Sequence, residues 1–356
     1  MKTSFDDRAR QSLTALALVV GIAFSASEAK AAQVLYVGND NTPGTVLQYS
    51  LPLTASSTSN FGIASNNVLA VAVDASGNLA VGSLGGGLQF FTAPLSAASV
   101  PSATFPNGAA SNNGGIAFTN AGDFWAATFS NQVNAFTHPF SNASTPSTFV
   151  TNAAMASTAG TAFDAAQNLY VSNAGSGTAI TCSSGAGLCS NLLVYAPPYT
   201  GAPIITPNVP SAFYRKIAVT ATQLFAASVA GAAGRVDAYN LPITAASVPA
   251  FSFVAGVNLP EALAVDASGN LYVGNLGNAT VSVYNAPITS GSVPSVVLTI
   301  GSGAFAIFGI AIGNVVVAAP PVAVAAPAFG MWGMLFLSAM LTVVVAVRLR
   351  RRKSAF

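Results

Sequence analysis

The stretch "ALAVDASGNLYVGNLGNATVSVY", residues 262–284, decides the fold of this chain. It contains an alternating apolar run, a polar segment from Asp266 to Asn270, and a second alternating run. Alternation with a period of two is typical of strands, and Asp, Ser, Gly and Asn are typical of tight turns. A third run ends at Tyr284. The stretch therefore predicts antiparallel strands joined in a meander.

The same pattern recurs along the chain in phase with a proline. A close copy, "LAVAVDASGNLAVGSLGGGLQFF", starts at Leu69, and looser copies lie between the two. After each third run comes a motif such as "YNAPITSGSVP", with its proline at Pro52, Pro94, Pro139, Pro198, Pro242 and Pro287. The spacings are 42, 45, 59, 44 and 45 residues. A period of this length indicates a protein built from repeated structural units.

Each repeat holds four predicted strands in about 45 residues, which is the size of a propeller blade. The fourth strand, such as residues 295–300, follows the proline motif. The chain enters the pattern at a second strand, "VLYVG", and the missing first strand appears near the other end as residues 308–313. We therefore predict an all-β, six-bladed β-propeller over residues 33–315, closed by pairing of the N- and C-terminal strands.

The repeat core from Asp266 to Val273 resembles that of NHL and related six-bladed propellers. The resemblance implies the fold and says little about function. Six-bladed propellers include lactonases that hold Ca²⁺ in the central channel with Glu, Asn and Asp. Here Asn39, Asn173 and Asn275 follow the second strand at equivalent places, which makes them the channel candidates. Because Asn side chains lack the charge that holds a divalent cation firmly, we expect no cofactor, and weak Ca²⁺ binding is the alternative.

Charge is scarce, at 6% of the residues. Between residues 33 and 318, three basic residues stand against seven acidic ones, a formal charge of −4. Nucleic-acid binding requires a basic stripe for phosphate contacts, so this class of partner is excluded. The single histidine, His138, excludes His-clustered metal sites and leaves most catalytic triads without a base. We therefore predict no catalytic residues, and the composition favours a protein that is not an enzyme.

Asp74, Asp164 and Asp266 recur at the head of the turn between the first and second strands of their repeats. A functional interpretation would make them metal ligands. Their repetition in phase with the turn favours a structural role instead. In that role the carboxylate accepts hydrogen bonds from backbone N–H groups two residues on, and a glycine of the turn adopts a positive φ.

Cys182 and Cys189 flank "SSGAGL" in an insert that lengthens the fourth repeat. Two cysteines at the ends of one loop in an exported chain predict a disulfide. A closed loop this short would gain about 2–3 kcal/mol in the chain-entropy account. We predict that the pinned loop, residues 179–191, projects from one face of the propeller and is a candidate recognition loop.

The two ends of the chain have the patterns of export and membrane signals. Residues 1–32 show a charged start, an apolar run and small residues near Ala31, as in a secretory signal peptide. Residues 316–327 form an Ala/Val/Pro spacer, and the uncharged residues 328–347 are long enough for a transmembrane helix. The tail, residues 348–356, carries the membrane-orienting residues Arg348, Arg350, Arg351, Arg352 and Lys353. By the positive-inside rule this tail is cytoplasmic and the propeller lies beyond the membrane.

Pro327 directly precedes this apolar run, and Trp332 and Gly333 lie near its start, ahead of the basic cluster. They resemble the IPTL-type (PEP-CTERM-like) C-terminal sorting domain of Gram-negative bacteria. The resemblance implies an exosortase-like transpeptidase that removes the helix and passes the propeller to the surface. A permanent single-pass anchor is the alternative.

These signals predict an exported propeller, held at the inner membrane with its body in the periplasm or released to the cell surface or extracellular matrix. The expected partners are the membrane, the transpeptidase, and glycans or surface proteins bound by loops on a rigid scaffold. The predicted function is that of a binding or structural module of the bacterial envelope. The rival is a lactonase-like hydrolase or lyase with a weak divalent metal in the central channel.

Overall fold

The computed structural model describes residues 32–40, 44–85, 87–108, 112–175, 189–300 and 306–315. No helix within these ranges has the length and apolar character needed to cross a membrane. The chain divides into two compact units, residues 1–316 and 317–356, and all described residues belong to the first. Apart from Ala32, the predicted signal peptide, spacer, sorting motif, transmembrane helix and basic tail lie outside the described residues.

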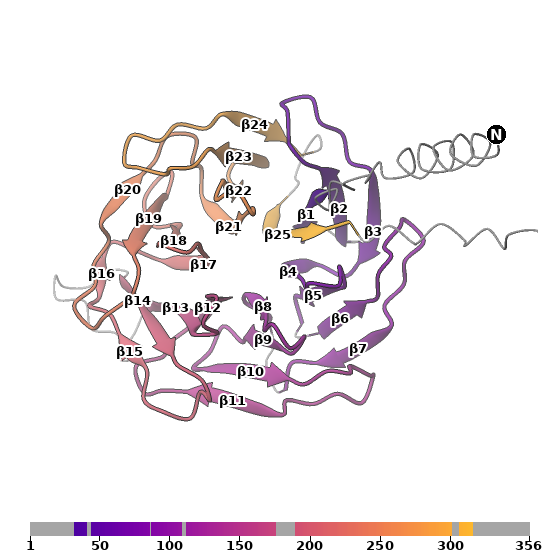
Figure 1. Ribbon diagram of the computed structural model, residues 1–356, viewed down its shortest axis with the longest axis horizontal. Helices are drawn as coiled ribbons and strands as arrows, with labels where there is room; N and C mark the ends of the chain where they lie inside the picture. The colour runs from indigo at the N-terminus through magenta and orange to yellow at the C-terminus, as the bar shows by residue number, and fades with distance from the viewer. Residues whose placement is uncertain are drawn as a thin grey trace, which may run out of the picture. The chain divides into compact units, whose positions relative to one another are not determined.

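The strands form six antiparallel sheets arranged as the blades of a ring (Figure 1). From the inner to the outer strand, the first blade contains β25 (Ile307–Asn314), β1 (Gln33–Asn39), β2 (Gly44–Ser50) and β3 (Phe61–Ser65). The second contains β4 (Val68–Val73), β5 (Leu79–Ser83), β6 (Gly87–Phe91) and β7 (Ala103–Pro106). The third contains β8 (Ile116–Phe118), β9 (Phe124–Ala127), β10 (Gln132–Phe136) and β11 (Thr148–Thr151).

The remaining three blades follow the same order. The fourth contains β12 (Thr158–Phe163), β13 (Leu169–Gly175), β14 (Cys189–Tyr195) and β15 (Ile204–Ile205), with β16 (Val209–Pro210) also paired to β14. The fifth contains β17 (Tyr214–Val219), β18 (Gln223–Ser228), β19 (Arg235–Asn240) and β20 (Phe251–Phe253). The sixth contains β21 (Pro260–Val265), β22 (Leu271–Asn275), β23 (Thr280–Tyr284) and β24 (Val296–Thr299). The predicted all-β, six-bladed fold is confirmed.

The ring closes in the first blade, between strands from opposite ends of the propeller sequence. β25 pairs antiparallel with β1, from Gln33 opposite Asn314 to Gly38 opposite Gly309. The C-terminal segment thus supplies the inner strand of a blade whose other strands are N-terminal, as predicted. β25 extends the predicted strand by one residue at each end. Closure pairs two strands that would otherwise each leave an open edge.

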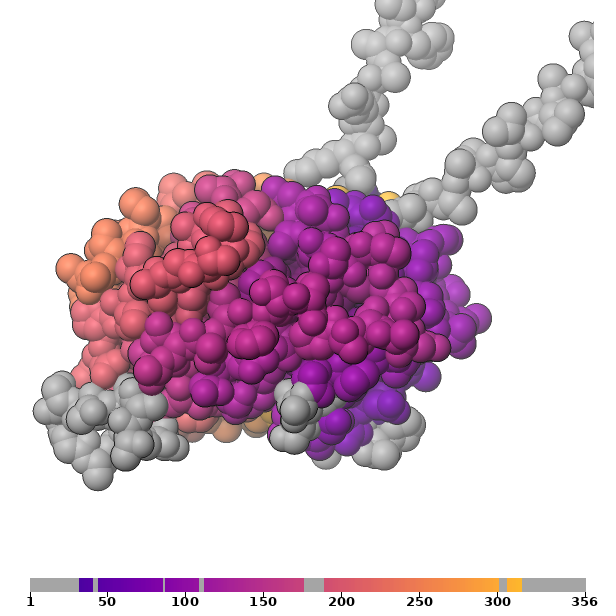
Figure 2. Space-filling model, turned by 90° about the horizontal axis from the view of Figure 1, so that it is seen from below, coloured from indigo at the N-terminus to yellow at the C-terminus, as the bar shows by residue number. Residues whose placement is uncertain are grey.

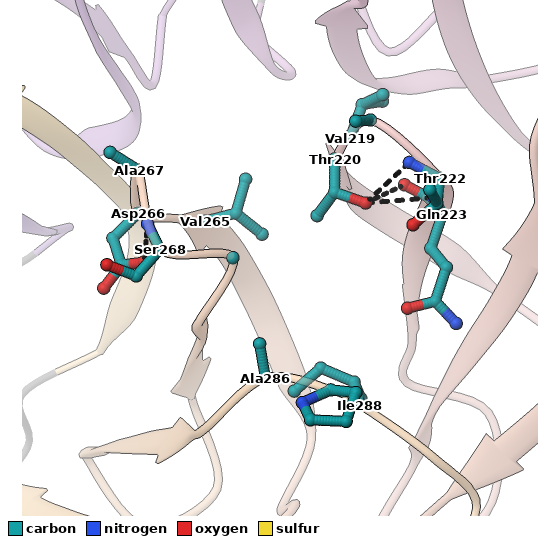
Figure 3. Close-up of a pocket in the computed structure, with 13 residues that line it drawn as sticks. Val219, Thr220, Thr222, Gln223, Val265, Asp266, Ala267, Ser268, Ala286 and Ile288 are labelled. Atoms are coloured by element: carbon teal, nitrogen blue, oxygen red, sulfur yellow. Dashed lines mark hydrogen bonds between the residues drawn. The ribbon is translucent and has the colours of Figure 1, made fainter.

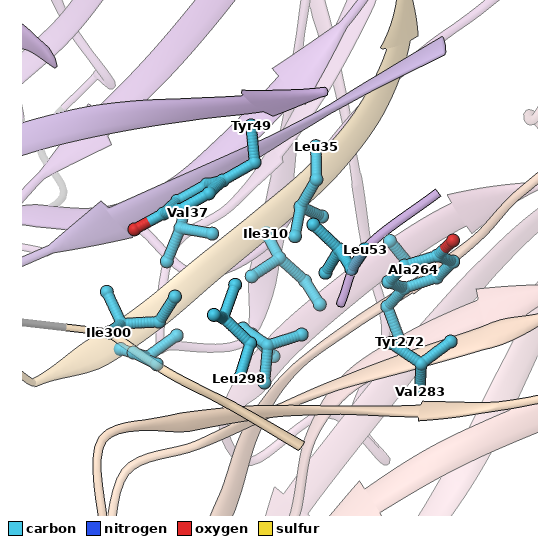
Figure 4. Close-up of a cluster of buried hydrophobic side chains, with 13 residues drawn as sticks. Leu35, Val37, Tyr49, Leu53, Ala264, Tyr272, Val283, Leu298, Ile300 and Ile310 are labelled. Atoms are coloured by element: carbon cyan, nitrogen blue, oxygen red, sulfur yellow. The ribbon is translucent and has the colours of Figure 1, made fainter. Parts of the chain in front are cut away.

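The core lies between blades. Buried apolar side chains of the described residues form six clusters, one for each pair of neighbouring blades. Figure 4 shows the cluster at the closure, in which Leu35 and Val37 of β1 lie with Tyr272 and Val283 of the sixth blade. Because the blades cover each other on both faces, β22 and β23 are buried at every position. Seen from its edge, the ring presents a continuous outer wall (Figure 2).

The two ends of the ring carry different connections. Since strand direction alternates within a blade, the turns that join first to second and third to fourth strands share one end, which we name the turn face. The other connections lie at the opposite end, the channel face. The repeat prolines follow the third strands on the turn face, and all six peptide bonds before them are cis: Pro52, Pro94, Pro139, Pro198, Pro242 and Pro287.

The fourth blade departs from the others at its insert. We predicted a loop over residues 179–191, but β14 already begins at Cys189, and Asn191 is buried within it. The prediction was wrong at this end because residues 189–191 pair with β13 and so belong to the sheet. Cys182 lies outside the described residues, so its disulfide with Cys189 stays a prediction.

Candidate functional site

On the turn face, carboxylates hold the turns between first and second strands in the second, fourth and sixth blades. Asp266 Oδ1 accepts hydrogen bonds from the backbone N–H groups of Ser268 (2.8 Å) and Asn270 (2.9 Å), and Oδ2 accepts one from the Asn270 side chain (2.8 Å). Asp74 makes the equivalent three bonds in the second blade. Gly269 has a φ of +82°, which the turn requires. Asp164 accepts two such bonds from Asn168, so the predicted capping role is confirmed for all three aspartates, although in the Asp164 turn Gln167 and not a glycine has the positive φ.

In the second, third and sixth blades, the last residue of the turn is hydrogen-bonded to the proline motif. Asn78 Oδ1 accepts a hydrogen bond of 2.9 Å from the backbone N–H of Ala93, which directly precedes a repeat proline. In the third blade Asp123 Oδ1 accepts the corresponding bond from His138 (2.9 Å). The exposed His138 ring contacts Phe140 edge-on. His138 therefore occupies a repeated structural position of the turn face.

The fifth blade departs from this turn. Thr220 stands where the sixth blade has Asp266, and the turn is one residue shorter. Thr220 Oγ1 accepts hydrogen bonds from the backbone N–H groups of Gln223 (2.9 Å) and Thr222 (3.3 Å), so a hydroxyl replaces the carboxylate as the cap. Ala221 and Thr222 are exposed at the tip.

A groove of about 570 Å³ separates the fifth and sixth blades on the turn face (Figure 3). Its walls are the turn at residues 219–223 and the turn at residues 265–269, and the proline motif at residues 286–288 closes one end. Figure 3 shows Thr220 and Thr222 across an open space from the Asp266 turn. Ligand sites in proteins commonly have volumes of about 300–1,000 Å³, so the groove can hold a small molecule.

An equivalent groove of about 580 Å³ lies between the fourth and fifth blades. The Asp164 turn forms one wall, and Leu241 and Pro242 close the end that residues 286–288 close in the first groove. Both grooves are lined by residues 219–221, so the short turn of the fifth blade is their common wall. Their lining residues offer hydroxyl, amide and carboxylate groups and include no basic residue, which favours neutral polar ligands over anions.

The predicted channel candidates lie at the channel-face ends of second strands. Asn39, Asn173 and Asn275 are all buried. Asn173 Oδ1 accepts a hydrogen bond from the Ala156 N–H (2.8 Å), and its Nδ2 donates to the Ala154 carbonyl (2.7 Å). Asn275 likewise bonds backbone groups of the loop at residues 256–258, whereas Asn39 Oδ1 accepts a hydrogen bond of 3.1 Å from the Thr45 N–H of the adjacent strand β2. The structure thus places Asn173 and Asn275 in contact with connecting loops of the channel face, and Asn39 in contact with the next strand of its blade.

The inner strands enclose a narrow channel. A Cβ atom on Gly160 would lie 2.6 Å from the Arg215 carbonyl oxygen, which shows how closely β12 and β17 approach. The central cavity measures about 50 Å³, enough for a few water molecules but too small for a sugar or lactone ring. All six blades line it, through Ala70, Val71, Gly115, Ile116, Thr161, Lys216, Ile217, Leu263, Gly309 and Ile310.

Most inner strands begin with a β-bulge at the channel face. The register shifts by one residue between Val68 and Ala70 in the second blade, and at the corresponding points of the fourth, fifth and sixth blades. A bulge redirects the side chain of its extra residue. The bulges of the fifth and sixth blades carry the charged residues Arg215, Lys216 and Glu261.

Arg215 and Glu261 join neighbouring blades through an ion pair. The Arg215 Nε and Glu261 Oε2 atoms lie 2.7 Å apart, and the Glu261 side chain is only 7% exposed. The guanidinium carbon lies 5.0 Å from the ring centroid of Phe129 and 5.5 Å from that of Phe213. A planar cation against two aromatic faces, with a buried carboxylate in line, is held in one orientation.

Lys216 lies beside this pair and lines the channel. Its Nζ donates a hydrogen bond of 3.3 Å to the Ala159 carbonyl and lies 5.6 Å from the Phe129 ring centroid. Burial, followed by the nearby Arg215 charge, lowers the pKa of the Lys216 ammonium from 10.5 to about 7, against an opposing effect of Glu261. The amine therefore changes charge near neutral pH.

The third basic residue of the propeller, Arg235, also belongs to the fifth blade. Its Nε lies 2.7 Å from Oδ1 of the fully buried Asp237, whose Oδ2 accepts a hydrogen bond from Tyr214 (2.8 Å). The Tyr214 and Tyr239 hydroxyls are 2.9 Å apart, and burial raises the pKa of both phenols. The fifth blade thus combines an unusual turn, a polar interior and the channel amine.

Sequence reasoning missed the charged cluster because its members come from different repeats and sit on bulges. The available signal was the placement of Arg215, Lys216 and Glu261 at the starts of inner strands in a body with few charges. Within the described ranges, no group of three or more His, Cys, Asp or Glu side chains is arranged to hold a metal.

No protein-family model matches the chain, and no curated protein matches it either. Among solved structures, a chain of a nidogen/laminin complex covers 80% of this chain with 99% of its own length, at a TM-score of 0.57 and 13% identity. A "putative 6-phosphogluconolactonase" from Bacteroides uniformis covers 79% of this chain with 99% of its own length, at a TM-score of 0.55 and 10% sequence identity. The structure of U3-55K covers 78% of this chain with 81% of its own length, at a TM-score of 0.51 and 11% sequence identity. At these identities the likeness shows the propeller fold alone.

Proposed function

We propose that this chain is an exported binding module of the bacterial envelope, and that it holds a neutral, hydroxyl-rich glycan on the turn face of an NHL-like propeller. The observation that carries the proposal is the pair of grooves of nearly equal volume on either side of the short turn at residues 219–223. Each groove sets hydroxyl groups opposite an Asp-capped turn. The protein hydroxyl groups can donate and accept hydrogen bonds, and the carboxylates can accept them, so both suit the hydroxyl groups of a sugar.

Two equivalent grooves with a common wall suit a ligand made of repeating units. Once one sugar unit of a chain occupies the first groove, the next unit of the same chain meets the second groove at a high effective concentration. An oligosaccharide should therefore bind more tightly than its monosaccharide, without any new type of contact. A polysaccharide of the envelope or matrix is the ligand class that fits this arrangement.

Calorimetric titration with neutral hexasaccharides and their monosaccharides tests this proposal. We expect at least one hexasaccharide of the cello, malto or chito series to bind at least tenfold more tightly than its monosaccharide. Ala221→Trp fills both grooves from their common wall and should abolish binding, since Ala221 is exposed and its change leaves the core intact. Ala75→Trp, at the corresponding turn of the second blade, is the matched control and should bind normally.

The glycan proposal is contradicted if no neutral hexasaccharide binds, or if Ala221→Trp binds as well as Ala75→Trp does. Circular dichroism of both variants would show that the fold is retained, so a loss of binding reports on the grooves.

The export part of the proposal rests on the ends of the sequence. Residues 1–32 are proposed as a signal peptide, residues 328–347 as a transmembrane helix, and Pro327, Trp332 and Gly333 as the motif read by an exosortase-like transpeptidase. Changing Trp332 and Gly333 together to alanine should leave the full-length chain in the inner-membrane fraction. Release of a shortened chain by this variant, as by the unchanged protein, would contradict processing at the motif.

A second candidate is a lactonase-like hydrolase or lyase, favoured by the fold likeness to a "putative 6-phosphogluconolactonase" and by the equivalent positions of Asn39, Asn173 and Asn275. These amides would have to exchange their present loop contacts for a cation. Native mass spectrometry in the presence of Ca²⁺ tests the idea. A stoichiometric ion that is lost in the Asn173→Ala and Asn275→Ala variants would favour the enzyme, and a metal-free spectrum would count against it.

A further inference from the structure

The channel face offers a second binding site that the glycan proposal does not use. At the starts of β17 and β21, two cations, Arg215 and Lys216, stand beside one carboxylate, Glu261. Glu261 pairs with Arg215 at 2.7 Å. The positive charge of a protonated Lys216 therefore has no carboxylate of its own among these groups.

The surroundings of Lys216 do not supply another counter-charge. On β17 the neighbouring ionisable group is Arg215, and on β21 it is Glu261. The residues that β4, β8, β12 and β25 contribute to the channel are aliphatic, Gly or Thr161. The amine is instead offered a neutral carbonyl, that of Ala159, and an aromatic ring.

The backbone at Phe129 supports a functional purpose for this arrangement. Phe129 has a φ of +51°, a region that a bulky residue rarely adopts. Its ring contacts both the Arg215 guanidinium and the Lys216 amine. Residues held in such conformations cluster at ligand sites, where surrounding structure maintains them.

We propose that the central channel binds one carboxylate group, which pairs with the protonated amine of Lys216. The cavity of about 50 Å³ admits a carboxylate head and excludes the ring that bears it, so the rest of a larger ligand would remain outside the channel. The cavity lining includes Lys216 and not Arg215, so the Lys216 amine is the charged group that meets the entering anion. The shared ligand chemistry is a carboxylate, either free as a small acid or carried by an acidic sugar.

Binding at this site takes up a proton. With the pKa of Lys216 at about 7, the empty channel carries a largely neutral amine at pH 8 and a largely protonated one at pH 6. Only the protonated form attracts an anion, and a bound carboxylate in turn raises the pKa of the amine. Affinity for a carboxylate should therefore be about tenfold higher at pH 6 than at pH 8.

Lysine-selective ¹³C labelling of the full chain tests the proposal. The chain has four lysines, Lys2, Lys30, Lys216 and Lys353, and Lys216→Met identifies the Lys216 ε-carbon resonance by its loss. We expect this resonance to titrate near pH 7 in chloride. Sodium acetate at the same ionic strength should raise its midpoint by about one pH unit or more.

Two variants and a second ligand complete the test. Lys216→Arg keeps the charge at every pH, so its affinity for acetate should no longer change between pH 6 and pH 8. Glu261→Gln removes the competing carboxylate and should bind acetate more tightly than the unchanged protein. Oligogalacturonate is the second probe: tighter binding than acetate assigns the site to acidic sugars, and equal binding assigns it to small acids.

Two results would overturn the proposal. One is a Lys216 resonance whose midpoint lies near pH 10.5 in chloride, and the other is a midpoint that is the same in sodium acetate as in chloride. The glycan experiment on the turn face uses neutral ligands and a different variant, so failure of either proposal leaves the other standing.

Discussion

The turn face and the channel face follow the repeat to different degrees. On the turn face, the second and sixth blades make the same capping bonds through Asp74 and Asp266, and all six repeat prolines are cis. On the channel face, the bulged positions carry unlike residues, from Leu69 in the second blade to Glu261 in the sixth. Contacts that every blade needs for folding recur, so a departure from the repeat points to a role outside folding.

The fifth blade departs from the repeat on both the turn face and the channel face. Its short turn forms the common wall of the two grooves, and its bulge brings Arg215 and Lys216 to the channel. The contrast with the second blade, which has a regular turn and an aliphatic bulge, can be tested with matched variants.

Breaking the ion pair between the fifth and sixth blades should have the largest effect on stability. Glu261→Leu leaves the Arg215 guanidinium without its carboxylate in a largely buried setting and should lower the free energy of unfolding by about 3–5 kcal/mol. Urea unfolding measures this change. The double variant Arg215→Met/Glu261→Leu should recover most of the loss, because it removes both charges. Strictly additive losses would contradict a direct coupling between the two residues.

The channel amine should make stability depend on pH. The pKa of Lys216 is about 7 in the folded protein and 10.5 in a solvated chain, so between these values the unfolded state binds a proton that the folded state lacks. Stability should therefore rise from pH 7 toward pH 9.5, by up to about 1.4 kcal/mol per pH unit. Lys216→Met removes this slope. Parallel urea midpoints of the two proteins across this pH range would contradict a lowered pKa.

The capping bonds of the turn face should contribute less and should differ between blades. Asp266→Ala removes four hydrogen bonds to a charged acceptor, one of them from the Tyr272 hydroxyl, and should cost about 1–2 kcal/mol. Thr220→Ala removes a neutral acceptor from the fifth blade and should cost about 1 kcal/mol or less. Thermal unfolding of the two variants compares them. A larger loss for Thr220→Ala would mean that the irregular turn stabilises the ring more than the regular one.

Much of the fold could be predicted from the sequence because it depends on local patterns. Alternating apolar runs predicted the strands, and segments such as "DASGN" predicted the turns. Because the N-terminal repeat lacks a first strand, the sequence also predicted that residues 308–313 supply it and close the ring. The cis geometry before Pro287 and its equivalents was not predicted, since an X-Pro sequence alone does not decide between isomers.

The candidate sites were harder to predict because they depend on contacts between repeats. Nothing near Arg215 in the sequence points to Glu261, 46 positions away in the next blade. A bulge has no clear sequence signature, so residues 215–216 looked like part of an ordinary alternating strand. Asn39, Asn173 and Asn275 stood out because they repeat, yet the structure pairs each amide with backbone groups of a connecting loop or an adjacent strand.

The central claim is that ligand binding uses the positions where the fifth blade departs from the repeat. Hydrogen exchange of the full chain, with and without the tightest-binding neutral hexasaccharide, tests it most directly. We expect slower exchange in the turns at residues 164–168, 219–223 and 266–270, and unchanged exchange in the turns at residues 74–78 and 119–123, which line neither groove. Equal protection of all five turns, or protection confined to residues 74–78 and 119–123, would contradict the claim.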